Sequence, residues 1–279
     1  MTELVKAIIF GIIEGITEWL PVSSTGHMIL LDEFLTLHVS PQFKEMFLVV
    51  VQLGAIFAVI VLFWDKIWPF AREGHGGAAA RISIRTDILT NWVKIAAACF
   101  PAVIFVVLGL DEICDALFYN PVCVSVALIV FGVAFIAVER RNAGRAAVAA
   151  TLQEITYPMA VLIGLFQLIA AAFPGTSRSG ATIVGALLIG VSRTAASEFT
   201  FILAIPVMFG ASLLKLTDFG FAMTREEWTL LAAGMVSAFL VSVAVIRFLL
   251  GYIRRHDFKV FGWYRIALGA VVLAYFGLR

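Results

Sequence analysis

Two carboxylates stand four residues apart near the start of the sequence. Glu14 and Glu18 lie in an otherwise apolar run, and this spacing puts both on one face of a helix. A carboxylate in an apolar helix is costly to bury and indicates a functional site, although a protonated, hydrogen-bonded structural pair would have the same spacing. Adjacent carboxylates can raise each other's proton affinity or share a divalent cation. The pair therefore predicts acid–base chemistry or a bound cation.

Two polar segments, far apart in the sequence, offer groups that bind phosphate. Ser23-Ser24-Thr25-Gly26-His27 contains three hydroxyls, a glycine and a histidine, and Gly175-Thr176-Ser177-Arg178-Ser179-Gly180-Ala181-Thr182 surrounds one arginine with four hydroxyls. Each runs into a short predicted helix, whose N-terminal N–H groups favour an anion. Arginine adds bidentate hydrogen bonds to phosphate oxygens. The segments therefore predict a phosphate cradle, because polar linkers between helices belong outside the membrane.

The composition places these segments in a membrane protein. Of the 279 residues, 62% are hydrophobic and 14% are charged, and the mean hydropathy is +1.01. Soluble domains average about 45–50% apolar and about 25% charged residues, so a soluble enzyme and a disordered chain are excluded. The formal net charge of +1 offers no basic footprint for a nucleic-acid partner. We therefore expect an all-α polytopic membrane protein in contact with membrane lipid.

The hydropathy pattern predicts six transmembrane helices and two interrupted ones. A spanning helix needs about 20 apolar residues, and the stretches that qualify are 46–64, 92–110, 122–138, 199–216, 228–250 and 260–278. Residues 4–37 and 157–191 each hold two shorter apolar runs, broken at 21–27 and 174–180. Polar backbone at membrane depth is tolerated only inside protein or beside a water-filled cavity. Both regions are therefore predicted to be re-entrant helix–loop–helix hairpins.

The two interrupted regions align at an offset of 153 residues. The offset places Gly11 over Gly164 and Pro21 over Pro174, although membrane sequences can also align through composition alone. Each repeat then holds one hairpin and three spanning helices, and an odd number of spans requires inverted topology. The predicted organisation is one integral membrane domain, 1–279, with repeats at about 1–140 and about 153–279.

Loop charge predicts the orientation. The loops at 65–91, 139–156 and 251–259 carry lysine and arginine, whereas 111–121 carries acidic residues and no basic one. Because basic loops stay in the cytoplasm, 111–121 and both termini are expected outside. The first hairpin then enters from the outer side and the second from the inner side. Inverted repeats with broken helices place a site where the breaks meet, near the middle of the membrane.

Several other polar and aromatic residues are expected to be structural. Glu45 and Glu198 are predicted at helix N-termini, where a carboxylate complements the helix dipole. Arg193 is expected to serve the cytoplasmic charge bias. Arg265 is expected to snorkel from a helix end, and Trp19 is grouped with the tryptophans of an interfacial belt.

The motifs themselves identify a family resemblance. Glu14-Gly-Ile-Thr-Glu18-Trp-Leu-Pro21-Val-Ser-Ser-Thr-Gly-His27 and Pro174-Gly-Thr-Ser-Arg178-Ser-Gly-Ala-Thr182 resemble the bacterial undecaprenyl-diphosphate phosphatase family, also called the bacitracin-resistance protein family. The resemblance covers essentially the whole chain. Gln167 and Ala171 stand in the second repeat where the first has its two glutamates. Acid–base work is therefore expected from the first repeat.

The resemblance implies a function, a location and partners. It implies a hydrolase that removes the terminal phosphate of undecaprenyl diphosphate and so recycles undecaprenyl phosphate, the lipid carrier for peptidoglycan and other envelope polymers. Bacitracin resistance follows from the same activity. It further implies a multi-pass protein of the bacterial inner membrane, a site that opens to the outer face, dependence on a divalent cation and a homodimer.

The residues and the resemblance converge on phosphoanhydride hydrolysis, in which the protein positions the phosphates and neutralises their charge. Catalytic roles are expected for Glu14, Glu18, Ser24, His27 and Arg178. Phosphate contacts are expected from Ser23, Thr25, Gly26, Thr176, Ser177, Ser179, Gly180 and Thr182. Glu14 and Glu18 are candidate ligands of Mg²⁺ or Ca²⁺, or one of them acts as a base. Ser24 is the favoured nucleophile, activated by a carboxylate or by His27; His27 itself or an activated water is the alternative.

The rival function is transport. Inverted repeats with broken helices are common in secondary transporters, and a flippase for a lipid phosphate would need the same cradle. A carrier needs no acid–base set, however, so His27 beside Glu14 and Glu18 favours the enzyme.

Overall fold

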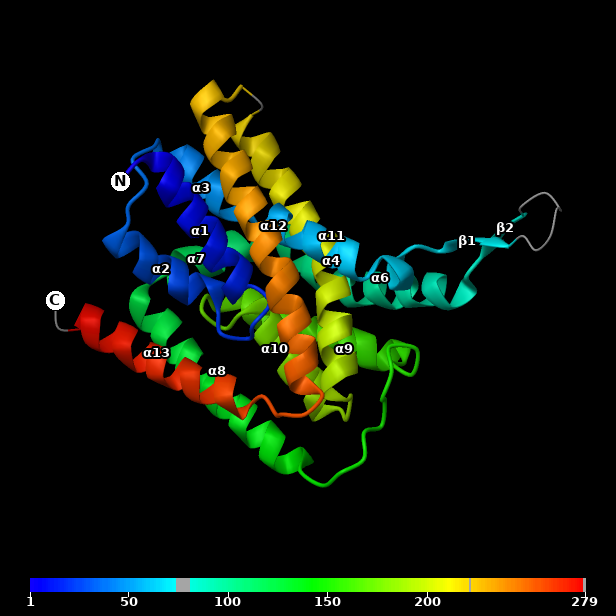
Figure 1. Ribbon diagram of the computed structural model, residues 1–279. Helices are drawn as coiled ribbons and strands as arrows, with labels where there is room; N and C mark the ends of the chain where they lie inside the picture. The colour runs from blue at the N-terminus through cyan, green and yellow to red at the C-terminus, as the bar shows by residue number, and fades with distance from the viewer. Residues whose placement is uncertain (74–80, 221, 278–279) are drawn as a thin grey trace.

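The helices and strands come from a computed structural model that describes residues 1–73, 81–220 and 222–277 (Figure 1). The helices are α1 Glu3–Thr17, α2 Ser24–Phe34, α3 Pro41–Val50, α4 Gln52–Leu62, α5 Trp64–Ile67, α6 Thr86–Val107, α7 Leu110–Phe118, α8 Pro121–Asn142, α9 Tyr157–Ala172, α10 Arg178–Leu188, α11 Arg193–Phe219, α12 Arg225–Ile253 and α13 Lys259–Gly277. Two short strands, β1 Phe70–Glu73 and β2 Arg81–Ile84, pair antiparallel. This strand pair, which the all-α prediction lacked, lies in the basic 65–91 loop, whose residues 74–80 are outside the described part.

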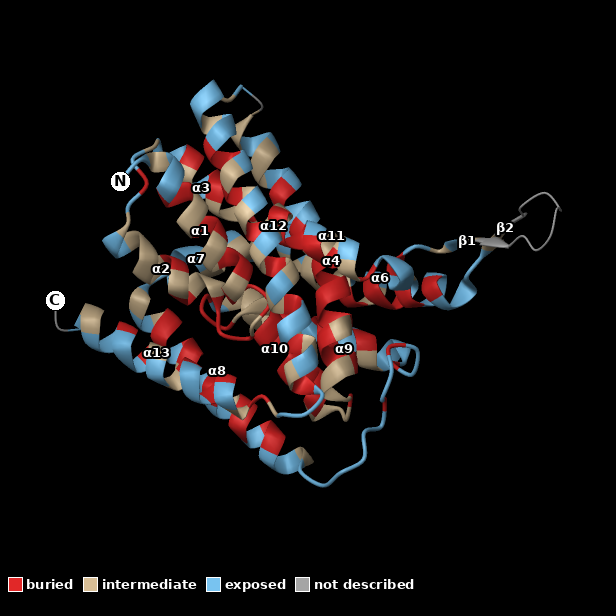
Figure 2. Cartoon of the chain, in the orientation of Figure 1, coloured by how far each residue is buried: buried red, intermediate tan, exposed pale blue. Residues whose placement is uncertain are grey.

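Within the described residues, six helical segments are long and apolar enough to cross a membrane, as predicted. They are α3 with α4, α6, α8, α11, α12 and α13. Several begin earlier than the hydropathy alone suggested, because polar caps precede the apolar run: Ser192 caps α11 and Ser40 caps α3. Along α8, valines at 122, 126, 130 and 133 are exposed, and Figure 2 shows exposed residues on the outward faces of α8 and α13. Such apolar exposed faces suit contact with lipid.

Both interrupted regions form helix–break–helix hairpins, but the breaks start and end earlier than predicted. The first runs from Glu18 to Ser23 and the second from Phe173 to Ser177, not over 21–27 and 174–180. Ser23 and Ser177 have φ values of 75° and 69°, and each side chain caps the next helix. The polar residues after these serines therefore lie in the first turns of α2 and α10.

The caps also correct the alignment of the two hairpins at this point. The offset of 153 placed Ser24 over Ser177, whereas the shared capping role pairs Ser23 with Ser177. Two residues separate Pro174 from Ser177, whereas one residue separates Pro21 from Ser23. Ser24 therefore corresponds to Arg178, since both are the first residue of their helix.

Each hairpin's first helix packs on a spanning helix of the other half of the chain. α1 lies along α12, and α9 lies along α6. A Cβ added to Gly11 would collide with the carbonyl oxygen of Gly234, and one added to Gly164 would collide with that of Ala98. α8 and α13 run side by side (Figure 1), and a Cβ at Gly132 would lie 2.7 Å from the Gly262 carbonyl oxygen. Small residues thus let these helix backbones approach closely.

Charged residues join the halves in ways the sequence did not predict. Glu45 and Glu198 lie beyond the first turns of α3 and α11 and form ion pairs with Lys215 and Lys66, so the expected role at helix N-termini was wrong. Both helices begin several residues before these glutamates. Arg193 likewise does more than bias topology: its guanidinium binds the buried Glu139 carboxylate, with Nη2 at 2.6 Å from Oε2.

Trp19 belongs to the core and not to an interfacial belt. Its side chain is fully buried, and its ring meets the Phe201 ring edge to face at a centroid distance of 5.2 Å. Trp64 and Trp68, by contrast, are exposed and stack on each other. Trp19 follows Glu18 directly and leads into the first break, so it packs the break against α11.

The chain ends and the basic connections lie on opposite sides of the molecule. In Figure 1 the N-terminus and the end of α13 are at the left, whereas the β1–β2 pair and the connections after α8 and α12 are at the right and bottom. This arrangement is the one that the loop charges require if the basic connections share one side of the membrane.

Candidate active site

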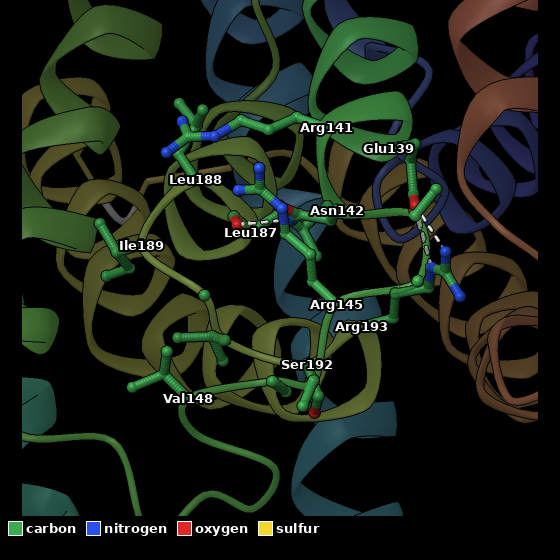
Figure 3. Close-up of a pocket in the computed structure, with 16 residues that line it drawn as sticks. Glu139, Arg141, Asn142, Arg145, Val148, Leu187, Leu188, Ile189, Ser192 and Arg193 are labelled. Carbon is green, nitrogen blue, oxygen red and sulfur yellow. Dashed lines mark hydrogen bonds and ion pairs between the residues drawn. The ribbon is translucent and has the colours of Figure 1, made fainter.

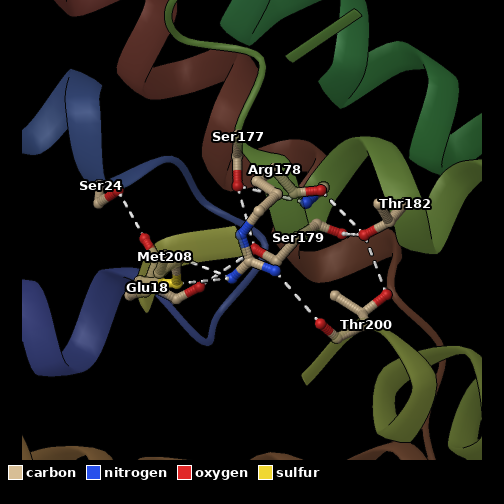
Figure 4. Close-up of polar contacts among 9 residues, drawn as sticks. Glu18, Ser24, Ser177, Arg178, Ser179, Thr182, Thr200 and Met208 are labelled. Carbon is tan, nitrogen blue, oxygen red and sulfur yellow. Dashed lines mark hydrogen bonds and ion pairs between the residues drawn. The ribbon is translucent and has the colours of Figure 1, made fainter. Parts of the chain in front are cut away.

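The carboxylate of Glu18 joins the two hairpins. Arg178 Nη2 donates to Glu18 Oε1 at 2.9 Å, and Ser24 Oγ donates to Glu18 Oε2 at 3.0 Å (Figure 4). Ser24 and Arg178 are the first residues of α2 and α10, and Glu18 caps the C-terminus of α1. Glu18 thus contacts two other predicted catalytic residues, Ser24 in the next helix and Arg178, which is distant in sequence. The side chain of Glu18 is 9% exposed, so this contact lies in a nearly dry environment.

Arg178 is held by further contacts from α11. Its Nη1 donates to the carbonyl oxygen of Thr200 at 3.2 Å, and its Nη2 lies 3.3 Å from Met208 Sδ. The arginine side chain is 13% exposed. Both terminal nitrogens of the guanidinium are thus engaged, so an oxyanion has to displace one of these partners to be bound by Arg178. Sequence reasoning missed Thr200 and Met208, because neither lies in a polar motif.

Glu14 lies one turn before Glu18 and is only 1% exposed. Its Oε1 has no hydrogen-bond partner in the described part of the chain. A buried, unpartnered carboxylate oxygen is costly and indicates that a proton, a water molecule or a ligand completes the site. Glu14 and Glu18 therefore remain together near the breaks, as their spacing predicted.

The donor set fits a cation only in part. Among the described residues there is no group of three or more histidine, cysteine, aspartate or glutamate side chains that could hold a metal ion. Mg²⁺ sites often take one or two carboxylates and complete their shell with water and substrate phosphate oxygens. Glu14, with its unpartnered oxygen, and Glu18 match such an incomplete set. A cation bound here would need oxygens from the substrate, and its presence stays a prediction.

Both ring nitrogens of His27 are engaged. Nδ1 lies 2.7 Å from the carbonyl oxygen of Ser23, and Nε2 lies 2.7 Å from the hydroxyl of Tyr264. A carbonyl can only accept, so Nδ1 carries the proton, and in the neutral ring Nε2 accepts from Tyr264. No hydrogen bond joins His27 to Ser24 in the described residues. The geometry therefore favours Glu18 over His27 as the group that activates Ser24.

Arg265 does not snorkel; that expectation was wrong. The side chain is fully buried and donates to carbonyl oxygens of both breaks, to Pro21 at 3.3 Å, Gly175 at 3.0 Å and Thr176 at 2.6 Å. Three backbone carbonyls with no other partner along their own broken helices attract a cation. Arg265 lies well inside α13, which begins at Lys259, and that depth was the available signal, because a charge at membrane depth marks a site by default.

The hydroxyls of the two capping serines are used within their helices. Ser23 Oγ accepts the Gly26 N–H at 3.4 Å, and Ser177 Oγ accepts the Gly180 N–H at 3.2 Å. A Cβ at Gly180 would lie 2.9 Å from Arg265 Nη1. Glycine there lets α10 approach the arginine that joins the breaks.

The remaining predicted phosphate ligands differ in what they contact. Ser179 Oγ donates to the Glu18 carbonyl oxygen at 3.1 Å, and Thr182 Oγ1 donates to the Arg178 carbonyl oxygen at 2.9 Å. Thr176 Oγ1 is buried without a hydrogen-bond partner among the described residues, and Thr25 is half-buried. The hydroxyls of Ser179 and Thr182 thus bind backbone carbonyl oxygens of the site itself, whereas the Thr176 hydroxyl has no partner among the described residues. Their contact with phosphate stays a prediction.

Comparisons with known proteins show the family of this chain. Residues 7–271 match the family described as bacitracin resistance protein BacA. Undecaprenyl-diphosphatase 1 of Clostridium acetobutylicum is 58% identical over 98% of this chain and 97% of its own. The undecaprenyl-diphosphatase of Desulfitobacterium hafniense is 56% identical over 100% of this chain and 98% of its own. That of Enterococcus faecalis is 55% identical over 97% of this chain and 96% of its own. The resemblance inferred from the two motifs is therefore confirmed, and the chain belongs to the bacitracin resistance protein BacA family.

Proposed function

We propose that this protein is a membrane-embedded undecaprenyl-diphosphate phosphatase. It removes the terminal phosphate of undecaprenyl diphosphate and so returns undecaprenyl phosphate to peptidoglycan and envelope polymer synthesis, which also gives bacitracin resistance. The observation that carries the proposal is the Glu18 carboxylate, which accepts hydrogen bonds from Ser24 and Arg178 at once. A carboxylate in contact with both a hydroxyl and a guanidinium suits phosphoryl transfer. Relatives that are 50–58% identical are named undecaprenyl-diphosphatases.

The Arg178–Glu18 ion pair suggests how the substrate starts the reaction. The diphosphate competes with Glu18 for the Arg178 guanidinium, which forks onto phosphate oxygens. Glu18, relieved of its cationic partner, takes the proton of Ser24 Oγ. This oxygen bonds to the terminal phosphorus while the bond from phosphorus to the bridging oxygen breaks, and undecaprenyl phosphate leaves with that electron pair. Water then attacks the phosphoserine, regenerates Ser24 and releases inorganic phosphate.

A direct attack by water, activated by Glu18, is the alternative that the contacts favour next. A phosphohistidine on His27 is disfavoured, because its unprotonated nitrogen accepts a hydrogen bond from Tyr264. The three candidate nucleophiles, Ser24, His27 and water, are distinguished by trapping the protein during turnover of diphosphate labelled with ³²P at the terminal phosphate and measuring the label on the protein. Acid-stable label lost in Ser24→Ala supports the phosphoserine, acid-labile label supports phosphohistidine, and no label with activity retained in Ser24→Ala supports water.

The decisive test is phosphate release from undecaprenyl diphosphate by the purified protein in detergent. Wild type is expected to release inorganic phosphate, and Ser24→Ala to lose most of this activity. Thr229→Ala is the control, because it removes an exposed hydroxyl that donates only to the Arg225 carbonyl oxygen of its own helix, α12, and lies outside both hairpins. Purified, folded protein without hydrolysis, or equal losses in both variants, contradicts the proposal.

Glu14 and Glu18 would hold the Mg²⁺ or Ca²⁺ ion that family membership implies. When bound there, a divalent cation neutralises charge on the phosphate oxygens. Glu14→Gln is expected to raise the cation concentration needed for half-maximal hydrolysis without loss of folded protein. A variant that is more stable and equally active would instead assign Glu14 to a structural role.

We infer that the two halves form an inverted repeat. The matching contacts of Gly11 with Gly234 and of Gly164 with Ala98 support this inference, as do the equivalent caps Ser23 and Ser177. Transport of a lipid phosphate is the rival function for such an architecture. The hydrogen bond from Ser24 to Glu18 favours hydrolysis, because a carrier has no use for an activated hydroxyl.

We propose a multi-pass protein of the bacterial inner membrane whose site opens to the outer face. Labelling with an impermeant thiol reagent in intact cells tests the orientation in a cysteine-free background. A cysteine at Ala116 is expected to react and one at His256 to be protected; the reverse pattern overturns the orientation. A homodimer is expected from family membership, and cross-linking in membranes tests it.

A further inference from the structure

A basic cavity lies at the C-terminal end of α10, the opposite end of this helix from Arg178. It has a volume of about 500 Å³ and is lined by the end of α8, the segment that follows it, the end of α10 and the start of α11. Three arginines line it, Arg141, Arg145 and Arg193, against one acidic side chain, Glu139. α8 and α11 are both candidate spans, and the cavity lies where one ends and the other begins. The cavity is therefore at the boundary of the membrane.

Two of the three guanidinium groups are unused. Arg193 is paired with Glu139, but Arg141 and Arg145 have no hydrogen-bond or ion-pair partner among the residues that the structure describes. Figure 3 shows both side chains reaching over Leu187 and Leu188, so that their guanidinium groups point to the same side of the cavity. A bias toward basic cytoplasmic loops explains the charge of these residues. It does not require them to converge on one cavity.

The rim of the cavity is apolar. Ala146, Ala147 and Val148 line it and are exposed, Val148 to 71%, and Ile189 lines it from the α10–α11 connection. A site for a free anion gains nothing from exposed apolar residues beside it. A lipid headgroup site needs them, because acyl chains must leave the charged centre along an apolar surface.

We propose that this cavity binds the phosphate headgroup of an anionic phospholipid of the bilayer. Arg141 and Arg145 bind the phosphate, as basic pockets between transmembrane helices do on the cytoplasmic side, and the alanine-rich rim receives the start of the acyl chains. The occupant is a bulk lipid with a phosphodiester, and the site is separate from the one that contains Glu18 and Arg178. The inference does not depend on the proposed hydrolysis.

Lipid titration of the full-length protein, purified and delipidated in detergent, tests the proposal. Native mass spectrometry measures the apparent Kd for dioctanoyl phosphatidylglycerol and for dioctanoyl phosphatidylcholine, with inorganic phosphate as competitor. The anionic lipid is expected to bind at least roughly tenfold more tightly than the zwitterionic one, and phosphate at the same concentration is not expected to displace it. Equal affinity for both lipids overturns the proposal. Displacement by phosphate assigns the cavity to a soluble anion and overturns the headgroup assignment.

Matched charge variants locate the binding. Arg141→Gln with Arg145→Gln is expected to raise the Kd for phosphatidylglycerol at least roughly tenfold, because two charge-assisted contacts are lost. Arg254→Gln with Arg255→Gln removes the same charge from the next basic connection, which does not line the cavity, and is expected to change it less than about twofold. Equal effects of the two double variants overturn the site.

A double lysine variant excludes misfolding or inverted insertion as the cause of a lost affinity. Arg141→Lys with Arg145→Lys keeps the basic loop and loses only the guanidinium forks. It is expected to raise the Kd by roughly threefold to tenfold. Unchanged affinity in this folded variant would show that net charge alone holds the lipid, and the proposed site would fail.

Discussion

The two hairpins use one backbone device and carry different chemistry. Each breaks at a serine with positive φ, and each serine hydroxyl accepts the N–H of a glycine three residues later. The first residue after the cap is Ser24 in one hairpin and Arg178 in the other. These equivalent positions bind the two oxygens of the same Glu18 carboxylate. The two hairpins thus place a side chain at the same point of the backbone, a hydroxyl in one and a guanidinium in the other.

The first helices of the two hairpins also differ in whether they carry an ionisable side chain. Glu14 in α1 corresponds to Gln167 in α9, and both are buried with unpartnered side-chain atoms in the described structure. An amide cannot take a proton from a hydroxyl or carry the charge that a cation requires. In the proposed mechanism the second hairpin therefore binds the substrate and the first reacts with it. This division of labour leads to predictions for residues at corresponding positions.

The largest effect is expected for Glu18→Gln, which makes the reactive hairpin unable to accept a proton. The variant keeps a hydrogen-bond acceptor but loses the base and the partner of Arg178. We expect kcat/KM for undecaprenyl diphosphate to fall at least about 1,000-fold. Glu45→Gln is the matched control, because Glu45 is an exposed ion-pair partner of Lys215, and it is expected to be near wild type. A Glu18→Gln enzyme with more than a tenth of wild-type activity would remove the base from the mechanism.

Arg178→Lys tests the binding hairpin and is expected to have the next largest effect. Lysine keeps the charge but loses the planar fork, at a cost of about 2–4 kcal/mol, or roughly 30- to 1,000-fold in kcat/KM. Arg178→Ala is expected to be at least as impaired. Arg225→Lys is the control, because Arg225 also begins a helix but lies outside both hairpins. Near-wild-type turnover in Arg178→Lys would mean that only the charge matters there.

Arg265→Lys tests whether the hairpins depend on their shared contact. An ammonium cannot reach three carbonyl oxygens spread over both breaks, so at least one is left unpaired. We expect the free energy of unfolding in detergent to fall by about 1–3 kcal/mol. Arg247→Lys, at an exposed position of α12, is expected to leave it unchanged. Equal stability of the two variants would show that Arg265 does not hold the breaks together.

Hydropathy and spacing predicted the parts of this molecule that depend on the chain alone. The six spans and the two hairpins followed from the length of the apolar runs, Glu14 and Glu18 from the cost of charge in such a run, and Arg178 from its place among the hydroxyls of the second polar segment. The start of each re-entrant helix did not follow. A serine with positive φ is rare, so the sequence favoured a longer loop than the caps at Ser23 and Ser177 allow.

Contacts between distant segments account for the remaining errors. Arg265 has the sequence context of a snorkelling arginine, and only the approach of both breaks to α13 turns it inward. Trp19 is buried because its ring packs against Phe201 of α11. Tyr264 meets His27 from 237 residues away, and no local pattern marks such a pair.

Tyr264→Phe tests the smallest difference between the hairpins, the histidine that only the first contains. Ala181 stands in the second hairpin where the first has His27. Because the Ser23 carbonyl oxygen fixes the proton on Nδ1, the Tyr264 hydroxyl occupies the only lone pair that His27 could use. In the proposed mechanism His27 is a positioning residue, which holds the Ser23 carbonyl next to Ser24. Loss of one hydrogen bond of about 1 kcal/mol should then lower kcat/KM by roughly threefold to tenfold.

Tyr252→Phe is the matched control, because Tyr252 also stacks on a histidine, His256, but far from the breaks. If His27 were the nucleophile or the base for Ser24, removing the tyrosine hydroxyl would free Nε2 and raise turnover. An increase in kcat for Tyr264→Phe would therefore return His27 to the reaction and remove Glu18 as the group that activates Ser24.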